Sequence, residues 1–330
     1  MNALQTPLVA EDQALVEGVL AGRLRALAKT ITLIESQRED HKRRAKAVLE
    51  ALLPHSGRAM RLGISGVPGV GKSTFIEALG LYLIARGMTV AVLAVDPSSS
   101  LTGGSILGDK TRMEHLSQST SAFIRPSPSA GSLGGVAEKT REAMLVCEAY
   151  GFDVIIVETV GVGQSETAVA GMTDMFCLLQ LPNAGDDLQA IKKGIMEIAD
   201  MIVVNKADID ARAAQLAKAQ LKSALHLLRP ASANWTVPVL TLSALQQDGV
   251  AEFWQQVEAY REAMQASGEF EAKRRHQALA WMWEMIDSGL RARFRGHPEV
   301  KRQLPGLREA VEEGATTPSA AAWRLLGMLN

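Results

Sequence analysis

The stretch from residue 61 to residue 74 constrains this chain more than any other. It reads RLGISGVPGVGKST: a short apolar run, a loop with glycines at 66, 69 and 71, and then Lys72 and Ser73 at the start of a helical pattern. This is the phosphate-loop pattern G-x-x-x-x-G-K-[ST] in the strand, loop and helix context that it requires. A glycine-rich turn before an ordinary helix is the alternative, and it leaves the match at all four fixed positions unexplained. The sequence therefore predicts a binding site for a nucleoside triphosphate.

The chemistry of this loop follows from its residue types. Glycine allows positive φ and close approach of the backbone, so that N–H groups converge on phosphate oxygens at a helix N-terminus. We expect Lys72 to reach the β- and γ-phosphates and the Ser73 hydroxyl to bind Mg²⁺. The residues predicted to bind the phosphates are Gly66, Pro68, Gly69, Val70, Gly71, Lys72, Ser73 and Thr74.

The size and composition of the chain exclude several classes of protein. Its 330 residues suffice for a large α/β domain with appended helices, and its net charge of −1 gives no general attraction to nucleic acids or acidic membranes. Cys147 and Cys177 are far apart and form no C-x-x-C pair, so we expect buried thiols in a reducing compartment. No signal peptide or membrane-spanning run is evident. We therefore expect a cytoplasmic protein; a removed organelle-targeting segment would leave no trace here.

Strand-like and helical patterns alternate through the middle of the chain. Apolar runs followed by helical segments predict an α/β fold, a P-loop NTPase with a mostly parallel central sheet. In such sheets ligands bind at the carboxyl ends of the strands. The predicted strands are 61–65, 89–95, 121–125, 152–158, 174–181, 201–205 and 237–242.

Helical patterns flank this region on both sides. Apolar periodicity predicts two helices between residue 11 and about residue 55, and further helices after residue 249. A stripe of tryptophan and methionine in the last part is more typical of a core than of an interface. We predict an N-terminal helical extension (1–57), a P-loop domain (58–267) and a C-terminal helical arm (268–330).

Two acidic residues surround a long loop rich in glycine and serine. Asp96 ends the second predicted strand, where a carboxylate can hold Mg²⁺ directly or through water; an Asx-type turn before the following proline is the alternative. Asp109 either caps the helix that begins after it or orients the attacking water, and the residues alone leave both open. Asp96 is thus a predicted metal ligand and Asp109 a candidate metal ligand and catalytic residue.

A third acidic residue ends the fourth predicted strand. Glu158 precedes Gly161 by three residues, which suits a metal-linked carboxylate and a backbone N–H that senses the γ-phosphate. A buried carboxylate with only structural partners is the alternative. Many GTPases have glutamine where Val162 stands, so hydrolysis must be assisted differently here. We predict Lys72, Asp109 and Glu158 as catalytic residues.

The loop after the sixth predicted strand carries the pattern N-K-x-D. The Asp208 carboxylate can accept hydrogen bonds from two ring-edge donors of guanine, a pair that adenine lacks. The stem of Lys206 would pack on the base, Asn205 would fix neighbouring loops, and the backbone of Ser243, Ala244 and Leu245 would meet the guanine carbonyl oxygen. These residues predict a preference for GTP over ATP.

Together the motifs resemble the MeaB/ArgK family, the GTPases associated with methylmalonyl-CoA mutase and related acyl-CoA mutases. The resemblance runs through about residues 61–250, and the flanking helices fit the family layout. It rests on GVPGVGKST (66–74), VDPSS (95–99), GGSILGDKTRM (103–113), ETVGVGQSE (158–166) and LPNAGDDLQAIKKG (181–194).

The resemblance implies a chaperone that hydrolyses GTP, gates the delivery of adenosylcobalamin to its mutase, and protects or rescues that mutase. It implies that Asp96, Asp109 and Glu158 serve Mg²⁺ binding and hydrolysis. It also implies that loop 182–193 is a switch that reports nucleotide state to the mutase. The predicted switch residues are Asp186, Gln189 and Lys192; a helix start with acids first and lysines later is the alternative. Family members are homodimers that pair through a C-terminal helical arm, so we expect the same of residues 268–330.

Two other functions remain as alternatives. Members of this family were also described as ATP-dependent kinases of periplasmic amino-acid-binding proteins, such as those for lysine, arginine and ornithine, and the N-K-x-D loop disfavours ATP. A nickel-delivery GTPase would need thiolate or histidine ligands, whereas the six histidines are scattered. The chain also lacks D-x-H-x-x-G, the cobalamin-binding pattern of the mutases, so we do not expect it to carry the cofactor in that way.

Overall fold

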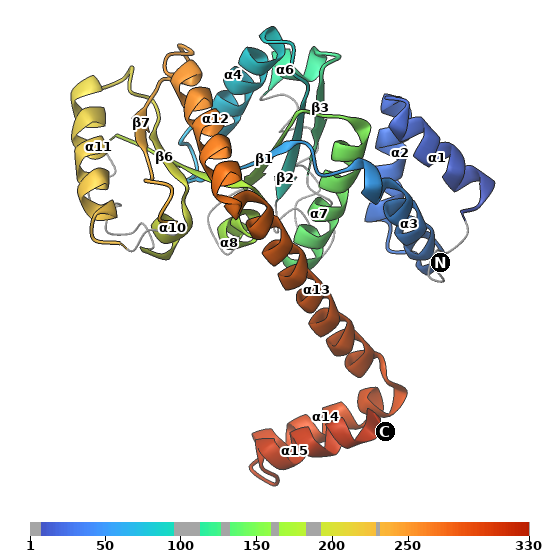
Figure 1. Cartoon of the computed structure of the whole chain (residues 1–330). Helices are drawn as coiled ribbons and strands as arrows, with labels where there is room; N and C mark the ends of the chain where they lie inside the picture. Colours follow the sequence, from blue (N-terminus) through green and yellow to red (C-terminus); the bar gives the residue numbers. More distant parts are fainter. Residues whose placement is uncertain are drawn as a thin grey trace. The chain divides into compact units, whose positions relative to one another are not determined.

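The centre of the molecule is a seven-stranded parallel sheet with the order β3-β2-β4-β1-β5-β6-β7 (Figure 1). The computed structural model describes residues 8–95, 113–126, 133–159, 165–182, 193–228 and 232–329. Each strand lies in or beside one of the predicted runs, and the predicted α/β fold is confirmed. The strands are β1 (Met60–Gly66), β2 (Val90–Val95), β3 (Ala122–Arg125), β4 (Val154–Thr159), β5 (Met175–Gln180), β6 (Met201–Val204) and β7 (Val239–Thr241).

Helices cover both faces of this sheet because alternate strand residues point to opposite sides. Val154 and Ile156 belong to one core cluster and Ile155 and Val157 to the other. The first cluster is covered by α4 (Lys72–Ala85), α6 (Glu114–Gln118) and α12 (Val250–Ser267), and the second by α7 (Leu133–Tyr150), α8 (Ser165–Ala170), α10 (Lys193–Ile198) and α11 (Ala211–Leu225).

The N-terminal extension contains three α-helices, so the prediction of two was wrong. They are α1 (Ala10–Leu20), α2 (Leu24–Glu35) and α3 (Glu39–Leu52), and the short 3-10 turn η1 (Leu53–His55) follows them. Gly22 has φ +69°, which no residue inside a right-handed helix can adopt, so the periodic pattern that spans it is divided. The three helices pack with α7 in the second core cluster, and Figure 1 shows them beside α7.

Ion pairs hold this extension together and join it to the sheet. Arg44 of α3 binds the buried Asp12 of α1, with 2.7 Å between Nη2 and Oδ1. Arg125, the last residue of the edge strand β3, binds Glu35, the last residue of α2, with 3.1 Å between Nε and Oε1. The second pair ties the end of α2 to the carboxyl end of β3.

The C-terminal helices are α13 (Glu269–Gly296), α14 (Pro298–Glu312) and α15 (Pro318–Leu326), with a last 3-10 turn η2 (Gly327–Leu329). The chain divides into two compact units, Met1–Phe270 and Glu271–Asn330. Thr317 caps α15, because its side chain accepts a hydrogen bond from the N–H of Ala320 at 3.2 Å. The three-part division of the chain stays a prediction. The second unit has a small core of its own, made by Val300, Leu307, Ala321 and Leu325.

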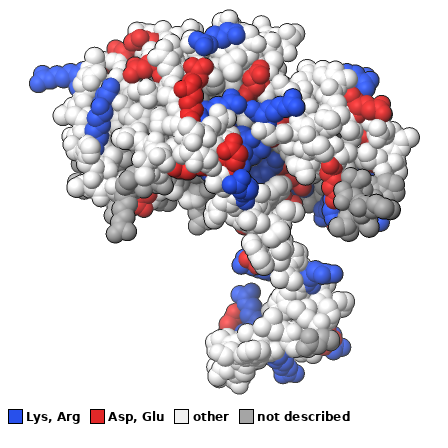
Figure 2. Space-filling model, in the orientation of Figure 1, with Lys and Arg blue, Asp and Glu red and all other residues white. Residues whose placement is uncertain are grey.

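The burial of the cysteines agrees with the sequence analysis. On the face drawn in Figure 2, basic and acidic side chains lie interspersed. Both cysteines are buried free thiols, and burial raises the pKa of Cys147. No helix in the described ranges combines the length and apolar composition that a bilayer crossing requires.

Candidate nucleotide-binding site

The phosphate loop lies at the carboxyl end of β1, the central strand of the sheet. Gly66, Gly69 and Gly71 have φ values of 154°, 77° and 92°, so all three have the positive φ that the glycine spacing predicts. A Cβ atom on Gly66 would lie 2.6 Å from the carbonyl oxygen of Leu179. At Gly66, therefore, both the backbone conformation and the neighbouring strand require glycine.

The loop ends at the N-terminus of α4, whose first residue is Lys72. Because the N-cap residue Gly71 has no side chain, the first-turn N–H groups of α4 are left for a ligand, which is the arrangement of an anion site. The Lys72 ammonium donates to the carbonyl oxygens of Gly66 at 2.6 Å and Val67 at 3.4 Å, so it lies over the loop. Ser73 is half-buried and Thr74 exposed in the same turn.

Asn205 joins the phosphate loop to the two loops predicted to hold guanine. Its buried side chain donates from Nδ2 to the carbonyl oxygen of Val70 at 2.8 Å and accepts at Oδ1 from the N–H of Ala244 at 3.0 Å. A Cβ atom on Gly71 would lie 2.8 Å from Nδ2 of Asn205, so glycine is needed there for this approach. One amide side chain thus connects segments that are 135 and 39 residues away from it.

The rest of the N-K-x-D loop follows the buried strand β6. Lys206 adopts φ +61°, a conformation that is uncommon outside glycine and recurs at functional sites. The next residue, Ala207, donates its N–H to Leu242 at 3.0 Å, which anchors the loop, and Asp208 is exposed beyond it. The carboxylate of Asp208 is therefore placed on a fixed backbone and open to a ligand.

The loop after β7 lies beside Asn205 through the Ala244 contact. Ser243 and Ala244 are buried and Leu245 is 77% exposed. Backbone hydrogen bonds in both directions between Ser243 and Asp248, at 3.0 and 3.1 Å, close this loop. The three predicted guanine-binding residues thus lie on a short closed turn next to the N-K-x-D loop.

Glu158 lies at the same edge of the sheet as the phosphate loop. It pairs in register with Ile64 of β1 and Ala94 of β2, and it is 3% exposed. Beside it the hydroxyls of Ser65 and Thr159 are hydrogen-bonded at 2.9 Å, a contact that sequence reasoning missed because the residues are 94 positions apart. The parallel register brings Glu158 and β1 together, as the strand pattern predicts.

Several predicted site residues lie outside the described residues. They are Asp96, Asp109, Gly161, Asp186, Gln189 and Lys192. Within the described ranges, no group of three or more histidine, cysteine or acidic residues forms a metal site. The hydroxyl of Ser73 and the carboxylate of Glu158 are nevertheless oxygen donors of the kind that Mg²⁺ takes in proteins.

A phosphate loop at the end of β1 and an N-K-x-D loop at the end of β6, bridged by Asn205, define a P-loop GTPase. Comparison with known proteins agrees with this class. The family described as methylmalonyl-CoA mutase-associated GTPase MeaB matches residues 27–299, and the chain belongs to this family. It is a GTP-hydrolysing enzyme, and the resemblance drawn from the motifs is confirmed.

Individual relatives match along nearly the whole chain. GTPase ArgK of Escherichia coli is 51% identical over 298 residues, 90% of this chain and 90% of that protein. The mouse mitochondrial methylmalonic aciduria type A homolog is 45% identical, over 94% of this chain and 78% of its own length. The crystal structure of a protein named LAO/AO transport system kinase superposes with a TM-score of 0.79 at 36% identity, covering 98% of this chain and 99% of that one.

Proposed function

We propose that this GTPase is a chaperone that gates the loading of adenosylcobalamin onto methylmalonyl-CoA mutase or a related acyl-CoA mutase, and that protects or reactivates that mutase. The family description names the mutase association. The observation that carries the GTP-dependent part of the proposal is the Asn205 bridge, because it joins the loop proposed to hold the phosphates to the loop proposed to select the base. A bound nucleotide would thereby contact one connected set of loops.

The described loops support the proposed recognition of GTP. The backbone N–H groups of the phosphate loop and the first turn of α4 would bind the phosphate oxygens, and Lys72 would turn from its loop carbonyls to the β- and γ-phosphates. The exposed Asp208 carboxylate would accept from the two guanine donors. The backbone of Ser243, Ala244 and Leu245 would meet the guanine carbonyl oxygen.

Mg²⁺ is the metal that fits the donors of this site. We assign Ser73 and Glu158 to it, together with Asp96 and Asp109, all of them oxygen ligands suited to a hard cation. When bound, the ion would neutralise charge that develops on the phosphates. Lys72, Asp109 and Glu158 are the proposed catalytic residues. Asp109 would hold or orient the attacking water. In many GTPases a glutamine at the position of Val162 does this, and a valine side chain cannot form a hydrogen bond to water.

The proposed contact with the mutase lies in the switch loop, residues 182–193. Asp186, Gln189 and Lys192 follow β5, and they enter the proposal because the sequence LPNAGDDLQAIKKG matches the family segment. A mutase-bound switch would order the hydrolysis site, so GTP turnover should be slow alone and faster with the mutase. We further propose a cytoplasmic location.

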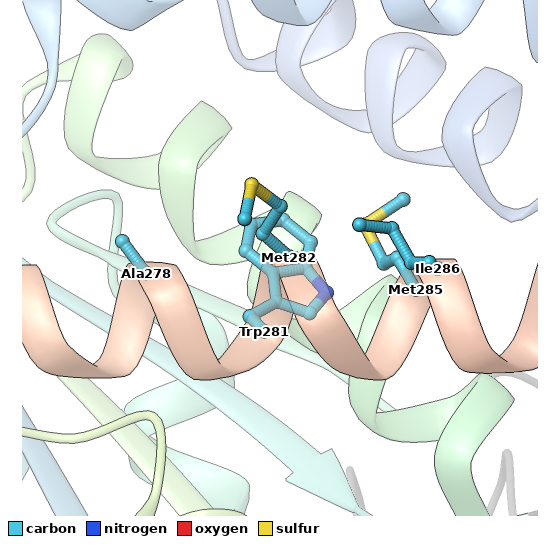
Figure 3. A pocket seen from close by; sticks show the side chains of 5 residues that line it. All are labelled: Ala278, Trp281, Met282, Met285 and Ile286. Atoms are coloured by element: carbon cyan, nitrogen blue, oxygen red, sulfur yellow. The ribbon is translucent and has the colours of Figure 1, made fainter.

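We also propose that the chain is a homodimer that pairs through residues 268–330. Leu279, Met282, Ile286 and Leu290 repeat at helical spacing on α13 and are 58%, 45%, 40% and 58% exposed. Such a stripe on a soluble helix calls for burial against another surface. Size-exclusion chromatography with light scattering at micromolar concentration should give the dimer mass, and a monomer mass would contradict the proposal. Figure 3 shows a groove on the same helix, lined by Ala278, Trp281, Met282, Met285 and Ile286.

The mutase assignment is tested by capture from native lysate of a source that makes the protein. The chain loaded with a non-hydrolysable GTP analogue should retain an adenosylcobalamin-dependent acyl-CoA mutase, identified by mass spectrometry, and Asp208→Ala should not. Asp210→Ser is the matched control, because Asp210 caps α11 by accepting from Ala213 at 2.9 Å and serine preserves the cap. Retention of no mutase by the native chain would refute the assignment.

Base selection is tested by calorimetry on the same variants. Asp208→Ala should lower the preference for GDP over ADP by about 100-fold, since two charge-assisted hydrogen bonds are lost. Asp210→Ser should keep the preference. An unchanged preference in Asp208→Ala would refute the proposal that Asp208 selects guanine.

A kinase acting on periplasmic amino-acid-binding proteins is the second candidate. The observation in its favour is the close structural match to a 36% identical protein that is named as a transport system kinase. That function predicts transfer of radiolabel from ATP to such a binding protein. The N-K-x-D loop predicts no transfer. Labelling from ATP, absent with GTP, would reverse the order of the two candidates.

A further inference from the structure

Leu242 connects the two loops that are proposed to hold guanine. Its N–H donates to the carbonyl oxygen of Val204, the last residue of β6, at 2.9 Å, and its own carbonyl oxygen accepts from the N–H of Ala207 at 3.0 Å. Ala207 is the neighbour of Asp208 in the N-K-x-D loop, and Leu242 is the neighbour of Ser243, where the closed turn after β7 begins. A displacement of the Leu242 backbone would therefore move both loops.

Gly249 lies against Leu242 at the start of α12. It is the N-cap residue of this helix and has φ +81°, in the region that favours glycine. A Cβ atom there would lie 2.8 Å from Cβ of Leu242 and 3.1 Å from the carbonyl oxygen of Thr241. Both of these atoms move only with the backbone, unlike the far end of a flexible side chain. A side chain at position 249 would thus push on the backbone at the end of β7.

The start of α12 is itself held in the core of the chain. Val250 and Phe253 are buried in the cluster that α4 and α12 cover, and the N–H of Phe253 donates to the carbonyl oxygen of Gly249 at 2.9 Å. The ring of Phe253 packs edge-on against Phe75 of α4, with 4.8 Å between the ring centroids. Because this packing fixes the helix, crowding at Gly249 would be relieved by movement of Leu242.

We propose that Gly249 is a positioning residue for guanine selection. Its lack of a side chain lets Leu242 hold the N-K-x-D loop and the turn after β7 in place relative to each other. One route runs through Ala207 to the carboxylate of Asp208, and the other runs through the turn to Ala244, whose N–H donates to Asn205. Gly249 acts through Leu242, and the inference rests on the base-selecting role of Asp208 under the proposed function.

The test is calorimetry of Gly249→Ala with GDP, IDP and ADP. Inosine lacks the amino group that is one of the two guanine donors to Asp208, so IDP reports on this contact alone. Gly249→Ala should lower the preference for GDP over ADP about tenfold and lower the preference for GDP over IDP as well, because a shifted carboxylate loses hydrogen-bond geometry. Affinity for ADP should stay within about threefold of native, since the phosphate loop keeps its own backbone. A general loss of structure would instead weaken all three nucleotides alike.

Gly268→Ala is the matched control. Gly268 is the C-cap residue of the same helix and has φ +74°, but a Cβ atom there would meet nothing within 4 Å. The substitution introduces comparable backbone strain at the other end of α12 without the contact, so the preference for GDP should remain within about twofold of native. If Gly249→Ala does not fold, Leu242→Ile decides the matter. It keeps the side-chain volume, adds a branch at the Cβ atom that faces Gly249, and should lower the same preference.

Three results would overturn the inference: an unchanged preference for GDP in Gly249→Ala, an equal loss of affinity for GDP, IDP and ADP, or the same loss of preference in Gly268→Ala. Asp208→Ala separates this inference from the proposed function. An unchanged preference in that variant would refute the role of Asp208 and, with it, the inference. A lost preference in Asp208→Ala beside a native preference in Gly249→Ala would refute the inference alone. The double variant should be no less selective than Asp208→Ala, because both changes act on one contact.

Discussion

The two sets of flanking helices have similar apolar periodicity but are buried differently. Leu27, Ile31 and Val48 of the N-terminal helices are fully buried in the core cluster that includes β4 and α7. On α13, by contrast, Leu279 is 58% and Trp283 is 61% exposed, and the small core of α14 and α15 has four buried residues. The N-terminal helices bury their apolar faces within the chain, whereas α13 leaves much of its apolar surface in water.

This difference indicates two roles: the N-terminal helices cover the core of the chain, and α13 is a candidate dimer interface. Helices α1–α3 pack on α7, and the Arg125–Glu35 pair ties α2 to the sheet. Removing them would expose apolar surface on α7. The apolar residues of α13 are already exposed, so a dimer would gain the free energy of their burial, about 25 cal/mol per Å². The following predictions test this contrast, from the largest expected effect to the smallest.

The largest effect should come from deleting each set of helices in turn. A chain that ends at residue 270 keeps the first compact unit and should bind GDP with native affinity as a monomer. A chain without residues 1–57 loses the cover of α7 and should be unfolded or aggregated at 25 °C. Thermal unfolding and nucleotide titration measure both. Cooperative unfolding with native GDP affinity in the second deletion would contradict the proposed difference between the N-terminal helices and α13.

A single buried residue should show the same contrast on a smaller scale. Ile31→Ala removes a fully buried side chain of α2 and should lower the free energy of unfolding by about 3 kcal/mol. Leu279→Ala, at a 58% exposed position of α13, should change it by less than about 0.5 kcal/mol while reducing the fraction of dimer. Urea denaturation measures the first quantity and light scattering the second. Equal losses of stability would show that α13 is buried in the monomer.

The third prediction concerns a buried hydroxyl group in α2. Thr30 is fully buried, and its Oγ1 has no hydrogen-bond partner in the part of the chain that the structure describes. Thr30→Val keeps the shape and removes the unsatisfied group, so it should stabilise the protein by about 1 kcal/mol. Thr32→Val is the control, because that hydroxyl donates to Ala28 at 2.9 Å and no gain is expected. A loss of stability in Thr30→Val would indicate a buried water at this site.

The sequence predicted those parts of the site that depend on short contiguous patterns. The positions of Gly66, Gly69 and Gly71 and of the seven strands along the chain follow from local patterns, and a parallel sheet places the strand ends at one edge. The hydrogen bonds that Glu77 accepts from the N–H groups of His115 and Leu116 in α6 carry no such signal, since the partners are 38 and 39 residues apart. A glutamate on an amphipathic helix looks the same whether it faces water or caps a neighbour.

Periodicity also gave no information about what covers an apolar face. Trp254 and Trp283 occur in similar helical patterns, yet the first is 3% and the second 61% exposed. The turn at Gly22 was likewise lost within a continuous periodic pattern, because apolar spacing across a turn can mimic a longer helix. These features depend on tertiary packing, which a single sequence pattern does not encode.

The smallest effect should be a pH dependence that arises on α7, the helix that supports the N-terminal set. Burial raises the pKa of Glu142 above its usual value, and the Lys139 ammonium, 2.9 Å away, opposes this shift only in part. The folded state therefore binds this proton more tightly than the unfolded state does. The stabilisation is fully present below the unfolded-state pKa of about 4.5 and is lost as the pH rises through the folded-state pKa.

Glu142→Gln removes this titration and should flatten the loss of stability as the pH rises from about 4.5, measured as thermal midpoints across the pH range. Asp40 supplies a control of opposite sign, because hydrogen bonding from Arg38 lowers its pKa to about 2. Its contribution is present above its usual pKa and is lost as the pH falls through about 2, so Asp40→Asn should alter only the acid limb. A Glu142→Gln profile that parallels the native one above pH 4.5 would show that the Lys139 pair offsets the burial of this carboxylate, and that the packing on α7 tolerates the charge at no net cost.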